Sequence, residues 1–377
     1  MPYPNASDAL AGLCAEWSAP AENAETLAAR LAELRQYGLD RLPLPGRGDT
    51  LARWRMLASV AGCDLALVKL FESHTDALAI IAETSDPSRH PDDATWAVWA
   101  AEPPFARLEI ALDPTTPERA TATTVGPGRT APALTDRQRV RLNGTKAWCS
   151  GAATVSHALV TASYDEAPYL AAVALDAPGV HVTRAGWHAV GMAVTQSVDV
   201  RFDDVDAVIV GTARSYLERP GFWYGGIGVA ACWWGAAVRL GQCLHASAGR
   251  RGEPHALAHL GAVDVALRHG QARLEAAAAW IDAHPRADAY YETLSVRAAI
   301  DGVVAEVIHH VGRGVGAGPY CRDPAFARLI ADLPVFVRQC HAERDLEALG
   351  AYRAEQDTTA WALGQPASFR HYGKVQP

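Results

Sequence analysis

The sequence predicts an α+β fold, mostly helical, in which two helical regions flank a central β region. Three observations support this. Apolar residues recur at intervals of three and four through residues 7–83, short alternating segments follow, and long helical patterns return after residue 216. We therefore expect an N-terminal helical domain, a small barrel or sandwich and a C-terminal four-helix bundle, at 1–90, 91–212 and 213–377 respectively.

Composition excludes several classes of protein. The chain has 377 residues, of which 49% are hydrophobic and 20% charged, so it is long enough for two or three cores. Its formal net charge of -8 argues against a nucleic-acid partner held by phosphate neutralisation, and a small-molecule partner fits better. No signal peptide pattern and no membrane-length apolar run are apparent, so we expect a cytoplasmic protein without a membrane partner.

The seven cysteines form no CxxC pair. We expect them to be reduced, as in most intracellular proteins. The pairs Cys340–His341 and Cys243–His245 have no complementary partners at zinc spacing, so no metal site is predicted.

The N-terminal region should end in a polar segment containing Pro87 and Pro91, which breaks the helical pattern and marks a domain boundary. The helix expected at 64–82 carries His74 among apolar residues. We interpret this single histidine as a satisfied core residue.

The β region is predicted from segments that alternate or are apolar throughout. Val140 and Leu142 alternate with charged residues, and Asn143-Gly144 is the dipeptide most typical of a two-residue hairpin turn, so we expect a β-hairpin over 138–150. A Gly/Pro-rich loop, Gly126-Pro127-Gly128, precedes it. Further strands are expected at 96–101, 107–112, 158–162, 169–175, 180–183 and 197–202.

The bundle is predicted as four long helices, at 227–246, 256–283, 287–311 and 324–349. The last two should be separated by an interhelical loop containing Gly312, Gly314 and Gly316. A dinucleotide fingerprint is improbable there, because a helix rather than a strand precedes it.

One stretch suggests a ligand. In the second strand of the expected hairpin, Trp148 precedes Ser150 by two residues, so both side chains should point to one face of the sheet. An indole beside a hydroxyl suits a planar heteroaromatic ligand, although packing explains the same pattern.

Two ordered motifs resemble those of acyl-CoA dehydrogenase-like flavoproteins. The segment 143–150 is similar to the family's "NG-x-K-x-W-[IC]-[ST]" strand, and 191–205 to its "G-M-x-x-T-x-S-x-x-V-x-F-x-D-V" run. The order of helices, β domain and bundle agrees with that family, so the resemblance extends over nearly the whole chain.

The resemblance implies non-covalent FAD. Trp148 would lie against the isoalloxazine ring, Ser150 near N5, and Cys149 between them. Ala101 stands where the family has a threonine that donates to the ring, which places that bond in doubt. The other implied cofactor residues meet the adenosine or pyrophosphate across a dimer, and they are Gly312, Gly314, and Arg250 or Arg251.

The resemblance also implies α,β-dehydrogenation of an acyl thioester, carried by CoA or a carrier protein, with an electron acceptor that the sequence does not name. Such a reaction needs a carboxylate base. The family's two positions for it fall at Ala331 and at Gly225-Gly226, and the nearest carboxylate is Asp332. Asp332 is therefore the candidate base.

Two alternatives remain open. A flavin-dependent monooxygenase on the same fold needs no such base, and His341 is then a possible proton donor. A catalytically silent relative would be a binding or scaffold protein. By the same resemblance, we expect a homodimer or homotetramer assembled through the bundle.

Overall fold

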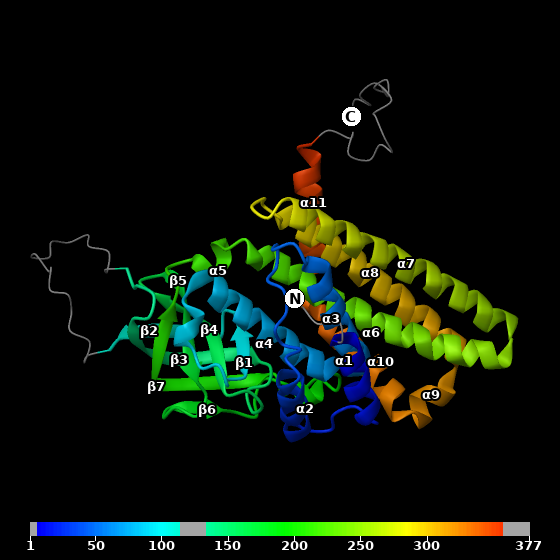
Figure 1. The fold of residues 1–377 in the computed structure, drawn as a ribbon, viewed down its shortest axis with the longest axis horizontal. Coiled ribbons are helices and arrows are strands. Elements are labelled where there is room, and N and C mark those ends of the chain that lie inside the picture. Colours follow the sequence, from blue (N-terminus) through cyan, green and yellow to red (C-terminus); the bar gives the residue numbers. More distant parts are fainter. Residues whose placement is uncertain (1–5, 114–132, 357–377) are drawn as a thin grey trace, which may run out of the picture.

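The computed structural model of the chain describes residues 6–113 and 133–356. A β-barrel lies at one end of the molecule and long helices at the other, with α4 (Leu65–Thr84) between them (Figure 1). The predicted fold class is confirmed. The predicted loop at Gly126-Pro127-Gly128 and the C-terminal tail lie outside the described residues.

The N-terminal region consists of α1 (Ala6–Glu16), α2 (Ala24–Gln36), α3 (Thr50–Cys63) and α4. Asp64 fixes the start of α4, because its carboxylate accepts from the first backbone N–H groups of that helix. The same carboxylate pairs with Arg30 of α2 at 2.8 Å, and both side chains are buried. A buried ion pair with this many hydrogen bonds is a well-satisfied one, and it joins α2 to α4.

Cys14 of α1 and Cys63 of α3 form a disulfide, with Cα atoms 5.7 Å apart. The expectation that all cysteines are reduced is therefore wrong for this pair. Sequence spacing could not reveal it, because the two residues are 49 positions apart and meet only when α1 packs on α3. The other described cysteines are free.

The central sheet closes into a barrel. Its pairings run from β4 through β2, β3, β7 and β5, and β5 pairs again with β4. The strands are β1 (Trp96–Trp99), β2 (Leu108–Leu112), β3 (Arg139–Cys149), β4 (His157–Tyr164), β5 (Ala167–Ala174), β6 (Val180–Val182) and β7 (Val198–Val210). The short helices η1 (Pro87–Arg89) and η2 (Ala193–Thr195) flank them.

The predicted hairpin is wrong: Asn143 and Gly144 lie inside the continuous strand β3, which pairs with β2 and β7. Gly144 does have the positive φ that the dipeptide indicated, at 123°. This backbone conformation occurs at a register shift between β3 and β7. A side chain at Gly144 would meet the carbonyl oxygen of Arg107. The Asn143 amide oxygen accepts from Asp204 N–H at 2.9 Å across the same irregularity.

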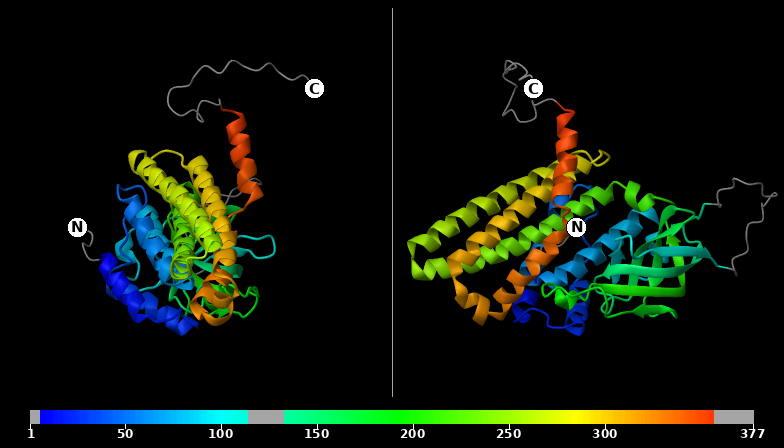
Figure 2. Two further views of the ribbon diagram at one scale, coloured as in Figure 1. Left: turned by 90° about the vertical axis from the view of Figure 1, so that its right-hand side faces the viewer. Right: turned by 180° about the vertical axis from the view of Figure 1, so that it is seen from behind.

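The C-terminal region begins with α5 (Ser215–Glu218) and continues with the long helices α6 (Gly221–Arg251), α7 (Pro254–Ala283) and α8 (Tyr290–Val315), followed by α9 (Ala317–Arg322), α10 (Pro324–Phe336), η3 (Val337–Gln339) and α11 (Glu343–Ala354). The long helices run side by side, and α11 projects away from them (Figures 1 and 2). Two predictions need correction. The helix α8 continues through Gly312 and Gly314, and the expected fourth helix is broken after Phe336, where Pro334 has already removed a backbone donor.

By length and composition alone, Gly221–Arg250 of α6 is apolar enough to cross a membrane, which the sequence analysis did not recognise. In this fold 67% of its most apolar window is buried. It is the core helix of the bundle, in contact with α3, α4, α7 and α8.

Two side chains of α4 attach that helix to the barrel edge. Ser73 Oγ accepts from Val98 N–H at 2.8 Å, and His74 Nδ1 accepts from Trp96 N–H at 3.1 Å. His74 must then carry its proton on Nε2, which donates to Asp40 at 3.2 Å. Burial lowers the pKa of His74. The interpretation of His74 as a satisfied core residue is confirmed, and these bonds hold the neighbouring polar residues of α4 between barrel and bundle.

Candidate active site

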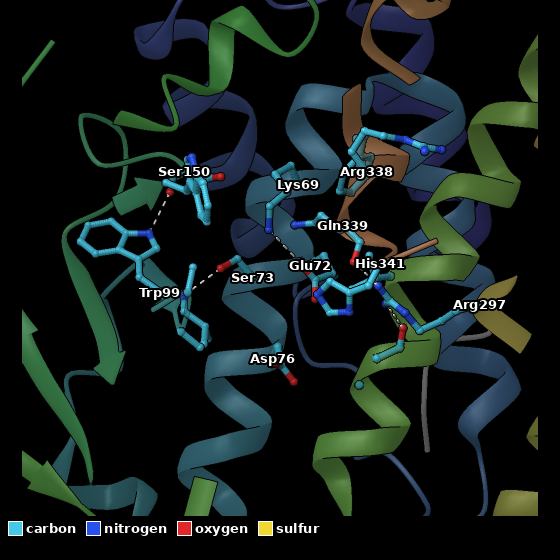
Figure 3. Close-up of a pocket in the computed structure, with 18 of the residues that line it drawn as sticks. Lys69, Glu72, Ser73, Asp76, Trp99, Ser150, Arg297, Arg338, Gln339 and His341 are labelled. Carbon is cyan, nitrogen blue, oxygen red and sulfur yellow. Dashed lines mark hydrogen bonds and ion pairs between the residues drawn. The ribbon is translucent and has the colours of Figure 1, made fainter. Parts of the chain in front are cut away.

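A cavity of about 1150 Å³ lies where the barrel, α4 and the bundle meet. It exceeds the roughly 300–1,000 Å³ usual for small-molecule pockets, so it has room for a large ligand together with a smaller one. Figure 3 shows side chains from each wall directed toward it.

The barrel wall carries Trp148 and Ser150, which both line the cavity, and their contact with a flavin stays a prediction. They do not alternate on a regular strand, because Trp148 has a left-handed φ of 57° and β3 ends at Cys149. The indole is 47% exposed despite its size. Ser150 Oγ lies 2.7 Å from Ser197 Oγ, which lies 3.0 Å from Thr195 Oγ1. This wall therefore offers a flat ring beside a chain of hydroxyl groups.

Ala101 and Cys149, the other cofactor residues that the resemblance implied for this wall, differ from each other in their position relative to the cavity. Ala101 lines the cavity, but it has no side-chain donor. Cys149 is fully buried behind the wall, where its thiol lies 3.2 Å from the carbonyl oxygen of Lys146 and burial raises its pKa. Cys149 is a packing residue in this structure.

Charged residues that the sequence analysis missed lie on α4, namely Lys69, Glu72 and Asp76. Glu72 is only 8% exposed, and its carboxylate accepts from Lys69 Nζ at 3.5 Å. Burial, assisted by the negative charge of Asp76, raises the pKa of Glu72. A signal was available, because these charges recur at one helical face of a segment that is otherwise almost entirely apolar.

On the bundle wall opposite α4, two of the lining residues are glycines. Gly225 and Gly226 line the cavity, at one of the two positions where the related family has its base. Arg297 of α8 closes this wall, and its guanidinium donates to the carbonyl oxygens of Gly226 at 2.8 Å and Gln339 at 2.6 Å.

The segment from α10 to α11 forms the remaining wall, and it contains His341. His341 Nδ1 lies 3.3 Å from Asp345 Oδ1, and its backbone N–H donates to Asp345 Oδ2 at 3.0 Å. The histidine side chain is 67% exposed, whereas its partner is buried. Such a pair orients the ring and can hold a proton beside the cavity.

Asp332 does not line the cavity, although Pro334, Val335 and Phe336 of the same helix do. Its carboxylate accepts from Met192 N–H and so attaches the 191–195 turn of the barrel to α10. Burial raises the pKa of Asp332 to about 6. The predicted placement of this residue as a base is corrected, because a step of one residue turns a helical side chain by about 100°.

The residues implied to contact the adenosine and pyrophosphate of FAD lie away from this cavity. Arg250 is exposed roughly 35 Å along α6 from Gly226, and Arg251 ends that helix. Gly312 and Gly314 lie in α8 rather than in a loop, where side chains would meet the hydroxyl of Tyr320 and the side chain of Leu244. None of the four lines this cavity.

Several polar groups of the cavity suit a flavin. Trp187 lines it, and its indole N–H is buried without a hydrogen-bond partner, which is the type of donor that ring carbonyls and nitrogens of a flavin require. The hydroxyl chain of Ser150, Ser197 and Thr195 offers further polar atoms. Arg344 at the cavity can supply the positive charge that a phosphate needs, whereas Arg338, which also lines the cavity, pairs with Asp301 at 3.0 Å. The residues present fit the group.

Comparison with known proteins supports the fold. Residues 116–205 match the model of the acyl-CoA dehydrogenase middle domain. No curated protein matches the sequence at a significant level. Among solved structures, FMN-bound TdsC from Paenibacillus sp. A11-2 is similar with a TM-score of 0.75 at 16% identity, over 93% of this chain and 97% of that one.

The chain has the acyl-CoA dehydrogenase-like fold. The resemblance predicted from its motifs is confirmed at that level. Other structures with this fold include methanesulfinate monooxygenase MsuC from Pseudomonas fluorescens, with a TM-score of 0.71 at 18% identity over 95% of this chain and 97% of that one. KijD3 in complex with FMN and an amino-keto sugar nucleotide has a TM-score of 0.69 at 19% identity, over 96% and 97%.

Proposed function

We propose that this protein is a flavin-dependent monooxygenase that uses FMN and acts on a small organic substrate. One observation carries the proposal: a single cavity holds the ring-and-hydroxyl wall of Trp148 and Ser150 together with His341, and it has volume for a flavin and a second molecule. Reduced flavin, when bound, supplies the chemistry that activates molecular oxygen. In this arrangement His341, oriented by Asp345, holds a proton at the cavity.

The choice of FMN over the predicted FAD rests on contacts within the chain. Gly312 and Gly314 would border an adenosine group, but the space in front of each is taken within the chain, where an added side chain would meet Tyr320 or Leu244. The solved structures of TdsC and KijD3 carry FMN, which agrees with this choice.

Two measurements test the proposal. Titration with FMN and with FAD should quench flavin fluorescence, with tighter binding of FMN. Reduced FMN from an external reductant, with oxygen and an aromatic thioether or indole, should then give a product that has gained one oxygen atom. Failure to take up either flavin would refute the proposal and favour the binding or scaffold alternative.

The second candidate is FAD-dependent dehydrogenation of an acyl thioester, which the match to the acyl-CoA dehydrogenase middle domain supports. Its base would be Asp332 only if that carboxylate left Met192, and Glu72 already faces the cavity. Anaerobic mixing of the flavin-loaded protein with acyl-CoA and acyl-carrier thioesters distinguishes the two functions. Bleaching of the flavin without oxygen would favour the dehydrogenase.

A homodimer or homotetramer is the assembly we propose, on the strength of the family resemblance. Arg250 and Arg251 lie at the far end of α6 from the cavity of their own chain, so they can contact a flavin phosphate only in another subunit. Light scattering at micromolar concentration tests this. A monomer with a full complement of flavin would remove both residues from the cofactor site.

A further inference from the structure

Two neighbouring carboxylates on α4 have few and distant hydrogen-bond donors. Glu72 and Asp76, here called the carboxylate pair, lie four residues apart and both line the cavity (Figure 3). Glu72 is nine-tenths buried, and its contact with Lys69 Nζ is long, at 3.5 Å. Asp76 Oδ1 is buried and has no hydrogen-bond partner. An ionised carboxylate accepts up to about four hydrogen bonds, so the pair requires donors from within the cavity.

The guanidinium groups of Arg53, Arg219 and Arg297 donate their hydrogen bonds elsewhere, and Arg53 donates to Pro43 and Thr75. Arg219 directs Nη1 to Glu83 at 2.9 Å, and its other terminal nitrogen stays 3.6 Å from Asp76 Oδ1. Arg297 donates to two backbone carbonyl oxygens. Like charges at positions i and i+4 of a helix also repel each other, so a cation placed between the carboxylate pair would be stabilised by both.

The surface beside the carboxylate pair suits an organic cation. A side chain at Gly225 would come within 3.1 Å of Asp76 Oδ1, so glycine leaves the space in front of that carboxylate open. Aromatic rings continue from there in successive edge-to-face contacts, with centroids 5.3, 4.9 and 4.9 Å apart, along Tyr216, Phe222, Trp223 and Tyr290. All four line the cavity, and ring faces attract cations. The Tyr216 ring already carries the Arg219 guanidinium, 5.4 Å from its centroid, so the other three rings are the ones offered to an ammonium group.

We propose that the substrate carries a protonated primary or secondary amine, which lies between Glu72 and Asp76 and against these rings. The ammonium N–H groups supply the donors that the two carboxylates lack. This inference rests on the proposed function, because it names the substrate class of the same cavity. An anionic group at the same position would be repelled by both carboxylates.

Calorimetry with matched probes tests the inference. The probes are 2-phenylethylamine and its neutral isostere 2-phenylethanol, each titrated into protein with and without FMN. Glu72→Gln and Asp76→Asn remove one charge each and keep the side-chain shape. Asp264→Asn is the control, since it removes one negative charge from an exposed position on α7. Circular dichroism and FMN titration establish that each variant is folded.

The amine should bind at least about tenfold more tightly than the alcohol, and each carboxylate variant should lose about tenfold of that affinity while Asp264→Asn keeps it. Equal affinities for the amine and the alcohol, or no measurable binding of the amine, would overturn the inference. So would a preference for the amine that survives when Glu72→Gln and Asp76→Asn are combined. The two proposals fail separately. Loss of the amine preference with normal FMN uptake refutes only the substrate class, whereas an amine preference without FMN uptake refutes only the flavin function.

Discussion

Replacing Asp332 with asparagine should stabilise the protein at neutral pH and leave its chemistry intact. The side chain is 2% exposed and accepts from Met192 N–H, and an asparagine amide oxygen can accept the same bond without a buried charge. Asp332 does not line the cavity, so flavin binding and turnover should persist in the variant.

The size of this stabilisation follows from the pKa of Asp332. Burial raises the pKa of Asp332 from 3.8 to about 6, which corresponds to about 3 kcal/mol between the two protonation states. Because the folded-state pKa lies above the unfolded one, the stabilising contribution is fully present below about pH 4 and is lost as pH rises through about 6. Asparagine has no such titration. The advantage of the variant should therefore grow by up to about 3 kcal/mol between pH 4 and pH 7.5.

Urea unfolding of both proteins, followed by circular dichroism at several values of pH, measures this difference. Asp264→Asn is the matched control, because that carboxylate is exposed and its removal should add no pH dependence. A difference between wild type and Asp332→Asn that stays constant with pH would refute the argument from burial. Loss of turnover without any change in stability would instead restore Asp332 as the base.

Three further substitutions test the site and its support. Gly191→Ala should lower the free energy of unfolding by about 1–3 kcal/mol, because the added Cβ would meet the carbonyl oxygen of Ala331. Gly249→Ala is the control, because its Cβ would enter open space, and equal melting temperatures of the two variants would contradict the prediction. His341→Gln should slow oxygen-dependent turnover by about 10²–10⁴-fold with FMN affinity unchanged, and unaltered turnover would exclude it as proton donor. Ser150→Ala should weaken FMN binding about tenfold in a fluorescence titration, and an unchanged dissociation constant would remove its hydroxyl from the flavin wall.

Local patterns predicted the parts of the fold that local forces determine. The order of helices, strands and helices followed from periodicity. Trp148 and Ser150 line the cavity, and the flavin contact that their motif implies stays a prediction. Asn143-Gly144 was misread because the same positive φ serves a hairpin turn and a register shift, and only the partner strands decide between them. The Cys14–Cys63 disulfide likewise depends on helix packing that the spacing of the cysteines does not encode.

The carboxylates of the cavity were missed for a more instructive reason. Reasoning from the related family located the base on α6 or α10, and the sequence offers glycine and alanine at those positions. The structure places acidic side chains on the opposite wall, where Glu72 and Asp76 of α4 face Gly225 across the space that the missing side chain leaves. A Cβ at Gly225 would come within 3.1 Å of Asp76 Oδ1, so an acidic side chain there would start close to a like charge. Both carboxylates belong to the helix that Ser73 and His74 attach to the barrel.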